Sequence, residues 1–227
     1  MVRKIKDYIN KLEVEFKNNA NPKIAFGQKA YLKNKFEFYG IKTGTRRKIQ
    51  EPFFNNNYLP SKDNLEKIVK TLWLKPEREY QYFTQELVFK YIKKFKKNDI
   101  KLFEFMLINK SWWDTIDFIT PKLIGEYFKL YPEFKTKYSK KWIASNNIWL
   151  QRSSLIFQLK YKNKLDTKTL KNNINSLLNS NEFFVNKAIG WILREYGKTN
   201  PKWVIKFVRK TELSNLSKKQ ALKHLDF

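Results

Sequence analysis

The chain has 227 residues, of which 42% are apolar and 17% aromatic, so it can bury a sizeable core rather than remain disordered. It contains no cysteine and one histidine, which excludes disulfides, thiolate metal sites, a cysteine nucleophile and a histidine-based zinc site. The formal net charge of +26 makes a polyanion the expected partner, with nucleic acid first and an anionic membrane surface second.

Helical signals run along nearly the whole chain. Asn21-Pro22 combines an N-cap with a proline in the first helical turn, and Asn200-Pro201 repeats this start near the C-terminus. Between them, Pro76-Glu77 opens a run over 80–95 in which aromatic and apolar residues recur every four positions. No stretch alternates as strands and hairpins do. The sequence therefore predicts an all-α fold with about twelve helices.

A spacing of 35 residues recurs from residue 80 onward. It separates Tyr82, Asp117, Arg152 and Lys187, and each of them lies in an aromatic-rich amphipathic segment. The corresponding helices are expected at Tyr80–Phe95, Trp112–Phe128, Trp149–Tyr161 and Phe184–Tyr196. Such a period is typical of an α-solenoid, here of HEAT-like two-helix repeats because the tetratricopeptide signature is absent. No linker divides the chain, so we predict a single domain over 1–227 with a concave, basic DNA-binding face. Three equal spacings can also arise by chance.

The residues around 111–117 could carry chemistry. In a helix, Trp113 and Asp117 are one turn apart and share a face, and Lys187 and Trp191 repeat this arrangement later in the chain. With Arg152 from the intervening repeat, a solenoid would bring two indoles, one carboxylate and one guanidinium together. A purely structural interpretation is also open, in which the indoles belong to the core and Asp117 forms an ion pair with Arg152.

Three motifs follow one another along the chain: Ser-Trp-Trp-Asp-Thr-Ile-Asp at 111–117, Trp-Leu-Gln-Arg at 149–152 and Ala-Ile-Gly-Trp-Ile-Leu-Arg-Glu-Tyr-Gly-Lys at 188–198. Together they make the sequence resemble, over essentially its whole length, the AlkD-like DNA glycosylases, which are HEAT-like repeat enzymes of DNA alkylation repair. The resemblance implies a DNA contact from Tyr31 and a damaged base that stays largely solvent-exposed. It also implies that the active site consists of Trp113, Asp117, Arg152 and Trp191.

The chemistry of such a reaction agrees with these residue types. Alkylation at N3 or N7 makes a purine cationic, so the base leaves with little help from a general acid. A carboxylate such as Asp117 can stabilise the positive charge that develops on the sugar and can orient the attacking water. The faces of Trp113 and Trp191 attract cations, worth on the order of 1–2 kcal/mol each. Arg152 is expected to hold a backbone phosphate bidentately.

A second candidate contact lies near the N-terminus. Thr43-Gly44-Thr45-Arg46-Arg47 places small hydroxyls and two of only seven arginines at a predicted helix start. Helix N-termini and arginine side chains both bind phosphates, although a solvated basic turn is the alternative. The lysine excess is less informative, since AT-rich coding DNA also produces it. The residues expected to bind DNA are Tyr31, Thr43, Arg46, Arg47, Arg152 and Lys187.

These observations predict a monofunctional glycosylase that releases cationic alkylpurines, such as N3-methyladenine and N7-methylguanine, from duplex DNA. We expect a monomer that needs no metal or cofactor. The main alternative is a non-catalytic DNA-binding solenoid that recognises distorted or branched DNA, and a protein-binding HEAT scaffold is a third. Asp117 separates the first two, because a carboxylate would repel a phosphodiester backbone. With so many lysines, lyase activity through a lysine nucleophile stays open.

The expected location is the cytoplasm, with association to the nucleoid through DNA. The N-terminus begins with a charged amphipathic stretch rather than an apolar signal peptide. No apolar run approaches the roughly 20 residues that are needed to span a bilayer.

Overall fold

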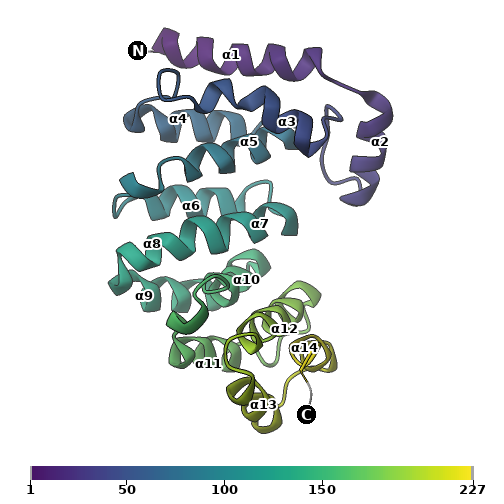
Figure 1. Ribbon diagram of the computed structural model, residues 1–227, viewed down its shortest axis with the longest axis vertical. Coiled ribbons are helices and arrows are strands. Elements are labelled where there is room, and N and C mark those ends of the chain that lie inside the picture. The colour runs from purple at the N-terminus through teal and green to yellow at the C-terminus, as the bar shows by residue number, and fades with distance from the viewer. Residues whose placement is uncertain (1, 226–227) are drawn as a thin grey trace. The chain divides into compact units, whose positions relative to one another are not determined.

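The computed structural model describes residues 2–225 and is helical through most of them (Figure 1). No strand occurs within this described range, where one isolated parallel bridge joins Glu37 to Glu77. The prediction of an all-α fold is thus confirmed. The chain separates into two compact units, Met1–Phe95 (unit 1) and Lys96–Phe227 (unit 2). The single domain over 1–227 stays a prediction.

Unit 1 is built on five α-helices and two short 3₁₀ turns. The helices are α1 (Val2–Asn18), α2 (Pro22–Tyr31), α3 (Thr43–Gln50), α4 (Lys62–Trp73) and α5 (Arg78–Phe89), and the turns are η1 (Pro52–Phe54) and η2 (Ile92–Lys94). Helix α1 lies along α3 and α4 (Figure 1). Its buried stripe of Tyr8, Leu12 and Phe16 packs toward α5, where the rings of Phe16 and Tyr80 are 5.4 Å apart. The predicted N-cap at Asn21 is confirmed, because its side chain accepts from the backbone N–H of Ile24.

A buried carboxylate fixes the loop that leads into α3. The carboxylate of Glu79, on α5, is 1% exposed and accepts hydrogen bonds from the backbone N–H groups of Tyr39, Gly40 and Ile41 at 3.0–3.1 Å. Gly40 has φ +87°, and a Cβ there would lie 2.0 Å from the carbonyl oxygen of Asn21. Only glycine fits this close approach. Both contacts set the position from which α3 begins.

Unit 2 contains the remaining helices, most of them paired with a neighbour in sequence. They are α6 (Asp99–Ile108), α7 (Trp113–Ile119), the π-helical turn η3 (Thr120–Ile124), α8 (Gly125–Leu130), α9 (Pro132–Ile143), α10 (Ile148–Ile156), the 3₁₀ turn η4 (Lys162–Lys164), α11 (Thr167–Asn175), α12 (Phe183–Gly197), α13 (Pro201–Lys210) and α14 (Asn215–Ala221). Helix α10 packs against α7, α9 and α12. The predicted cap at Asn200 is confirmed by its bond from the backbone N–H of Trp203.

Two of the predicted helices extend too far. The helix expected over 80–95 ends at Phe89, and the one expected over 149–161 ends at Ile156. In the second case the side chain of Gln158 exchanges hydrogen bonds with the backbone of Asp166 at 2.8 and 3.3 Å. Apolar residues continue at helical spacing beyond both ends, and after Ile156 the hydrogen bonds of Gln158 hold the chain in a non-helical course. The periodicity of apolar residues does not reveal where such a helix ends.

A wide turn follows α7 directly. Pro121 cannot donate a hydrogen bond to the carbonyl of Asp117, and in a regular α-helix its ring would clash with that carbonyl four residues earlier. The chain accommodates the proline in the π-helical turn η3 and then continues as α8. The predicted segment 112–128 is therefore one helical run with a local widening. Such turns are frequent at functional sites.

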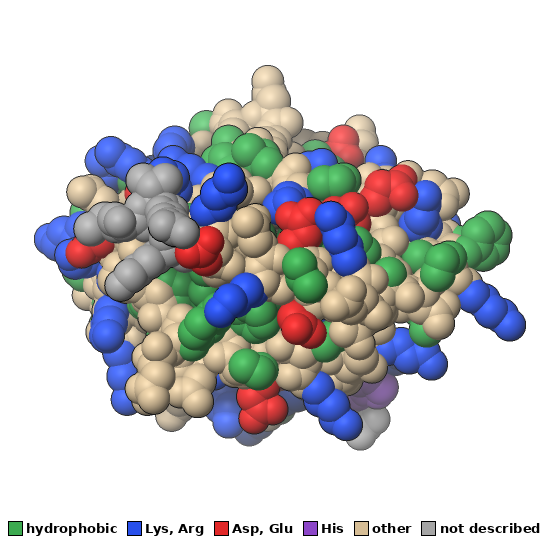
Figure 2. Space-filling model, turned by 90° about the horizontal axis from the view of Figure 1, so that it is seen from above, with side chains coloured by type: hydrophobic (Ala, Val, Ile, Leu, Met, Phe, Trp, Pro, Cys, Tyr) green, Lys and Arg blue, Asp and Glu red, His purple; other side chains and the backbone are tan. Residues whose placement is uncertain are grey.

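Surface charge does not by itself mark a site on the face shown in Figure 2. Lysine and arginine side chains are spread over this face with aspartate and glutamate between them. None of the described helices combines the length and apolar character needed to cross a lipid bilayer. Contacts between particular side chains, rather than surface charge, therefore indicate the candidate site.

Candidate active site and nucleic-acid contacts

An ion pair between α7 and α10 is the centre of the candidate site in unit 2. Arg152 Nε donates to Asp117 Oδ1 at 2.8 Å, and Nη2 donates to Oδ2 at 2.9 Å. The side chain of Arg152 is 4% exposed and that of Asp117 is 22% exposed. The pair is therefore bidentate and mostly removed from water, while the side chain of Asp117 keeps some exposure.

Arg152 also contacts α12. Its Nη1 donates to the backbone carbonyl of Phe184 at 2.6 Å. Its guanidinium carbon lies 5.7 Å from the ring centroid of Trp191, within cation–π distance. One buried guanidinium thus connects three helices. The structure brings Asp117, Arg152 and Trp191 together as the sequence predicted.

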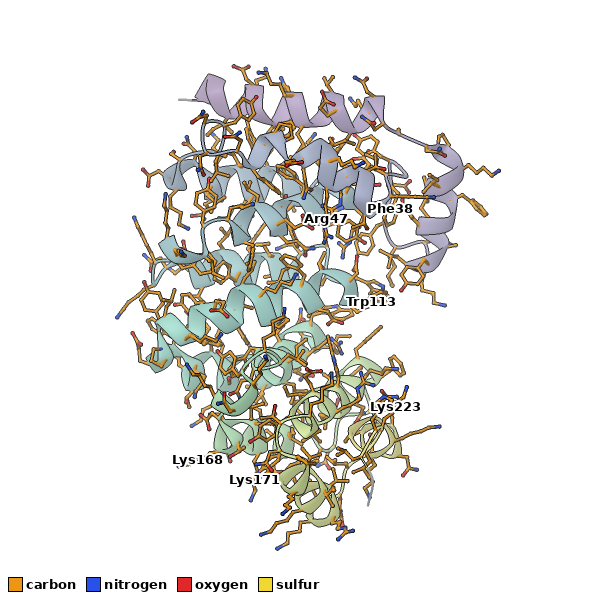
Figure 3. The ribbon with its side chains drawn as sticks, in the orientation of Figure 1. Phe38, Arg47, Trp113, Lys168, Lys171 and Lys223 are labelled. Atoms are coloured by element: carbon orange, nitrogen blue, oxygen red, sulfur yellow. The ribbon has the colours of Figure 1, made fainter. Side chains whose placement is uncertain are left out.

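Trp113 and Lys187 lie on the helices that carry these residues. Trp113 is the first residue of α7, one turn before Asp117, and its half-buried side chain is labelled in Figure 3. Lys187 lies one turn before Trp191 on α12, with its ammonium 5.5 Å from the ring centroid of Phe183. Residues at i and i+4 share a helix face, so Trp113 lies on the face of α7 that carries Asp117, and Lys187 lies on the face of α12 that carries Trp191.

A cluster of three aromatic residues joins α7, α10 and α12 next to the site, and the sequence analysis did not predict it. The ring of Trp112 packs against Trp149 at 5.4 Å and Phe184 at 5.3 Å, and the latter two rings are 4.9 Å apart. These residues tie the start of α7 to α10 and α12. The position of Trp149, one turn before Arg152 on α10, is the sequence signal that could have identified it as part of the site. Phe184 contributes both its ring and its backbone carbonyl, and nothing in the sequence indicated the role of the carbonyl.

The environment of Asp117 shifts its acidity in opposing directions. Burial raises the pKa of the Asp117 carboxyl above its ordinary value, and the charge and hydrogen bonds of Arg152 oppose that rise. The nearby carboxylate of Asp114 adds to the rise. Arg152 is therefore the group that favours the ionised form of Asp117.

The partners of Arg152 differ from the phosphate suggested by the sequence. Nε and Nη2 form the edge of the guanidinium that could bind a phosphate bidentately. Both of these atoms donate to Asp117. The structural alternative considered for these two residues, an ion pair, is what the structure contains. This geometry makes Arg152 a residue that positions Asp117.

The two arginines of α3, in unit 1, have different environments. Arg46 is 4% exposed, donates to Gln50 Oε1 at 2.7 Å and pairs with Glu86 at 3.0 Å. The side chain of Arg47 is 60% exposed, and its Nε is 3.6 Å from Glu86 (Figure 3). Arg46 therefore joins α3 to α5, whereas Arg47 is accessible to a phosphate.

The other N-terminal candidates are on the surface of unit 1. Thr43 is the exposed first residue of α3, as the sequence predicted for a helix start. Tyr31 is the last residue of α2 and is 70% exposed. Across residues 2–225, no three acidic or histidine side chains are grouped so that they could hold a metal ion.

Comparisons with known proteins identify the family and the fold of the chain. The model of a family described as DNA alkylation repair enzyme matches residues 12–225. A solved structure described as a predicted DNA alkylation repair enzyme from Enterococcus faecalis is 31% identical, with a TM-score of 0.85 over 91% of this chain and 97% of that one. AlkD2 from Streptococcus mutans is 16% identical and shares the fold, with a TM-score of 0.65 over 98% of this chain and 100% of that one. No curated protein sequence gave a significant match.

Proposed function

The chain belongs to the DNA alkylation repair enzyme family, and from this premise we propose that it is a monofunctional DNA glycosylase for cationic alkylpurines in duplex DNA. The observation that carries the proposal is a buried, bidentate Asp117–Arg152 pair next to Trp191. A carboxylate held in this way is fixed in position before substrate binds. Fixed charges in a partly dehydrated site are effective at stabilising a developing positive charge.

The proposed reaction breaks the bond between C1′ of the deoxyribose and the purine nitrogen. The electron pair of that bond leaves with the base, which turns from a cation into a neutral molecule. Positive charge grows on the sugar, water adds at C1′, and the water loses a proton. Because the leaving base is already cationic, the mechanism needs no general acid to protonate it.

Asp117 has the capacity for this role even though it is paired. A carboxylate has about four acceptor positions, and Arg152 occupies one on each oxygen. The remaining positions can accept a hydrogen bond from the attacking water or face the sugar. Since Arg152 opposes the upward shift of the Asp117 pKa, it also helps to keep the carboxylate ionised.

The aromatic and basic residues complete the proposal. We assign Trp113 and Trp191 to the cationic sugar and base, because indole faces attract cations. Lys187, half-exposed on α12, is assigned to a phosphate of the damaged strand. In unit 1, Arg47, Tyr31 and Thr43 are proposed to contact the DNA backbone.

One observation favours a second candidate function. The ion pair with Arg152 offsets the charge of Asp117, so the carboxylate repels a DNA backbone less than an isolated one would. A non-catalytic protein that binds distorted or branched DNA is therefore compatible with the same geometry. Excision activity, rather than binding, separates the two functions.

The decisive experiment measures the release of N3-methyladenine and N7-methylguanine from methylated duplex DNA. Asp117→Asn should bind DNA as well as wild type while losing about 10²–10³-fold in excision rate. Asp114→Asn is the matched control, because it removes the same charge one turn away on α7 and should keep its activity within a few-fold. Wild-type protein that binds but releases no methylated base would support the non-catalytic alternative.

A further inference from the structure

A half-open cavity in unit 2 lies between α11 and α13. Its volume is about 620 Å³, within the range of roughly 300–1,000 Å³ that is typical of small-molecule sites. Neither Asp117 nor Arg152 nor Trp191 lines it. The proposed glycosylase mechanism leaves this cavity without a role. Its lining residues are Lys171, Asn175, Leu178, Trp203, Lys206, Phe207, Lys210, Thr211 and Glu212.

The apolar part of the cavity is a pair of stacked rings. Trp203 and Phe207, one turn apart on α13, have ring centroids 5.1 Å apart and an interplanar angle of 6°. The ring of Tyr196 meets Trp203 edge-on at 5.4 Å, so the indole is held from two sides. Ligand stacking on an indole that is already fixed loses little side-chain entropy. Phe207 covers one face of the indole, so a planar ligand with a π face would stack on the part of Trp203 that lines the cavity.

The polar part is mainly cationic. Lys171 on α11 and Lys206 and Lys210 on α13 are exposed, and Figure 3 labels Lys171. Among the described residues, none of these three ammonium groups forms an ion pair with a carboxylate. Glu212 is the one acidic residue in the lining, so the lining has an excess of positive charge. Like charges at i and i+4, as in Lys206 and Lys210, destabilise a helix, and a bound anion would relieve their repulsion.

An aromatic surface beside several ammonium groups fits one class of ligand. We propose that this cavity binds a nucleotide, with the base stacked on Trp203 and the phosphate near Lys206 and Lys210. The nucleotide is either free or part of a single strand, since both present the same base and phosphate. The site operates separately from base excision, so the proposal does not depend on the activity of the Asp117 site.

Calorimetric titration tests this proposal with two probes, ADP and a thymidine tetranucleotide. Wild-type protein should bind at least one of them at a single site. The double variant Lys206→Ala/Lys210→Ala should weaken that binding by about tenfold or more, since it removes two charged hydrogen-bond donors to the phosphate. Lys202→Ala is the matched control: Lys202 is exposed on the same helix but does not line the cavity.

The outcomes separate the ligand sources and the competing explanations. Selective loss of ADP binding identifies a free nucleotide, and selective loss of tetranucleotide binding identifies a strand. Pyrophosphate should bind more weakly than ADP, and Trp203→Leu, checked for folding by circular dichroism, should remove that difference. Absence of binding of both probes to wild type overturns the proposal. An equal loss in Lys202→Ala also overturns it, because binding would then reflect charge alone.

Discussion

Replacing Arg152 by glutamine tests whether the guanidinium sets both the stability and the acidity of the Asp117 site. The change removes two hydrogen bonds to Asp117, one to the carbonyl of Phe184 and a cation–π contact with Trp191. Breaking a buried pair by removing one partner typically costs about 3–5 kcal/mol. Because 22% of the Asp117 side chain is exposed, water offsets part of this loss. We therefore expect a loss of about 3 kcal/mol, or about 6–12 °C in melting temperature.

The pH dependence gives a second, independent signature of the same variant. In the wild type, the pKa of Asp117 is already raised in the folded state, so its proton stabilises the fold at low pH and this stabilisation is lost as pH rises through that pKa. Without the opposing guanidinium, the pKa of Asp117 should rise further. The variant should therefore be closer to wild type in stability at low pH than at pH 8. The acid limb of excision should move to higher pH.

Thermal unfolding and excision, both followed from pH 5 to pH 8, measure these effects. Arg152→Lys provides the comparison, since it keeps the charge but loses the bidentate fork. It should lose stability while moving the acid limb less than glutamine does. A glutamine variant with wild-type stability and an unmoved acid limb would refute the assignment of Arg152 as the positioning residue.

Other predictions concern DNA binding, substrate range and the loop before α3. Arg47→Ala should weaken binding to undamaged duplex and make the slope of log K against log salt shallower by about one unit, whereas affinity that is insensitive to salt would remove nucleic acid as the partner. Trp113→Ala and Trp191→Ala should each slow excision of N7-methylguanine by about 5–30-fold, corresponding to about 1–2 kcal/mol. Uracil and hypoxanthine should not be released in a glycosylase assay, since their efficient excision would require a general acid. Gly40→Ala should lower the melting temperature markedly because its Cβ would meet a backbone oxygen, and an unchanged melting temperature would contradict that geometry.

The sequence was sufficient to predict features that depend on residues close together in the chain. Asn21 and Asn200 cap their helices through side chains that reach only three residues along the chain. The 35-residue spacing also placed Asp117, Arg152 and Lys187 on separate helices of unit 2. Helix positions could therefore be predicted from composition and period.

Features that depend on distant residues could not be predicted in this way. Arg46 and Arg47 are adjacent and identical, but only Arg46 is buried against Glu86, which lies 40 residues later. For Arg152, the ion pair with Asp117 was one of the interpretations that the sequence left open, but the hydrogen bond to the backbone carbonyl of Phe184, 32 residues later, was not foreseen. A backbone acceptor leaves no trace in the choice of side chain.

The hydrogen bonds that Glu79 accepts from the loop at 39–41 constrain the order in which unit 1 can fold. Those three amides need an acceptor that is not made until α5 is synthesised, about 40 residues later. A nascent chain that ends before residue 79 would leave them without this partner. The start of α3, with the proposed phosphate contact at Arg47, therefore becomes fixed only after α5 has emerged and packed.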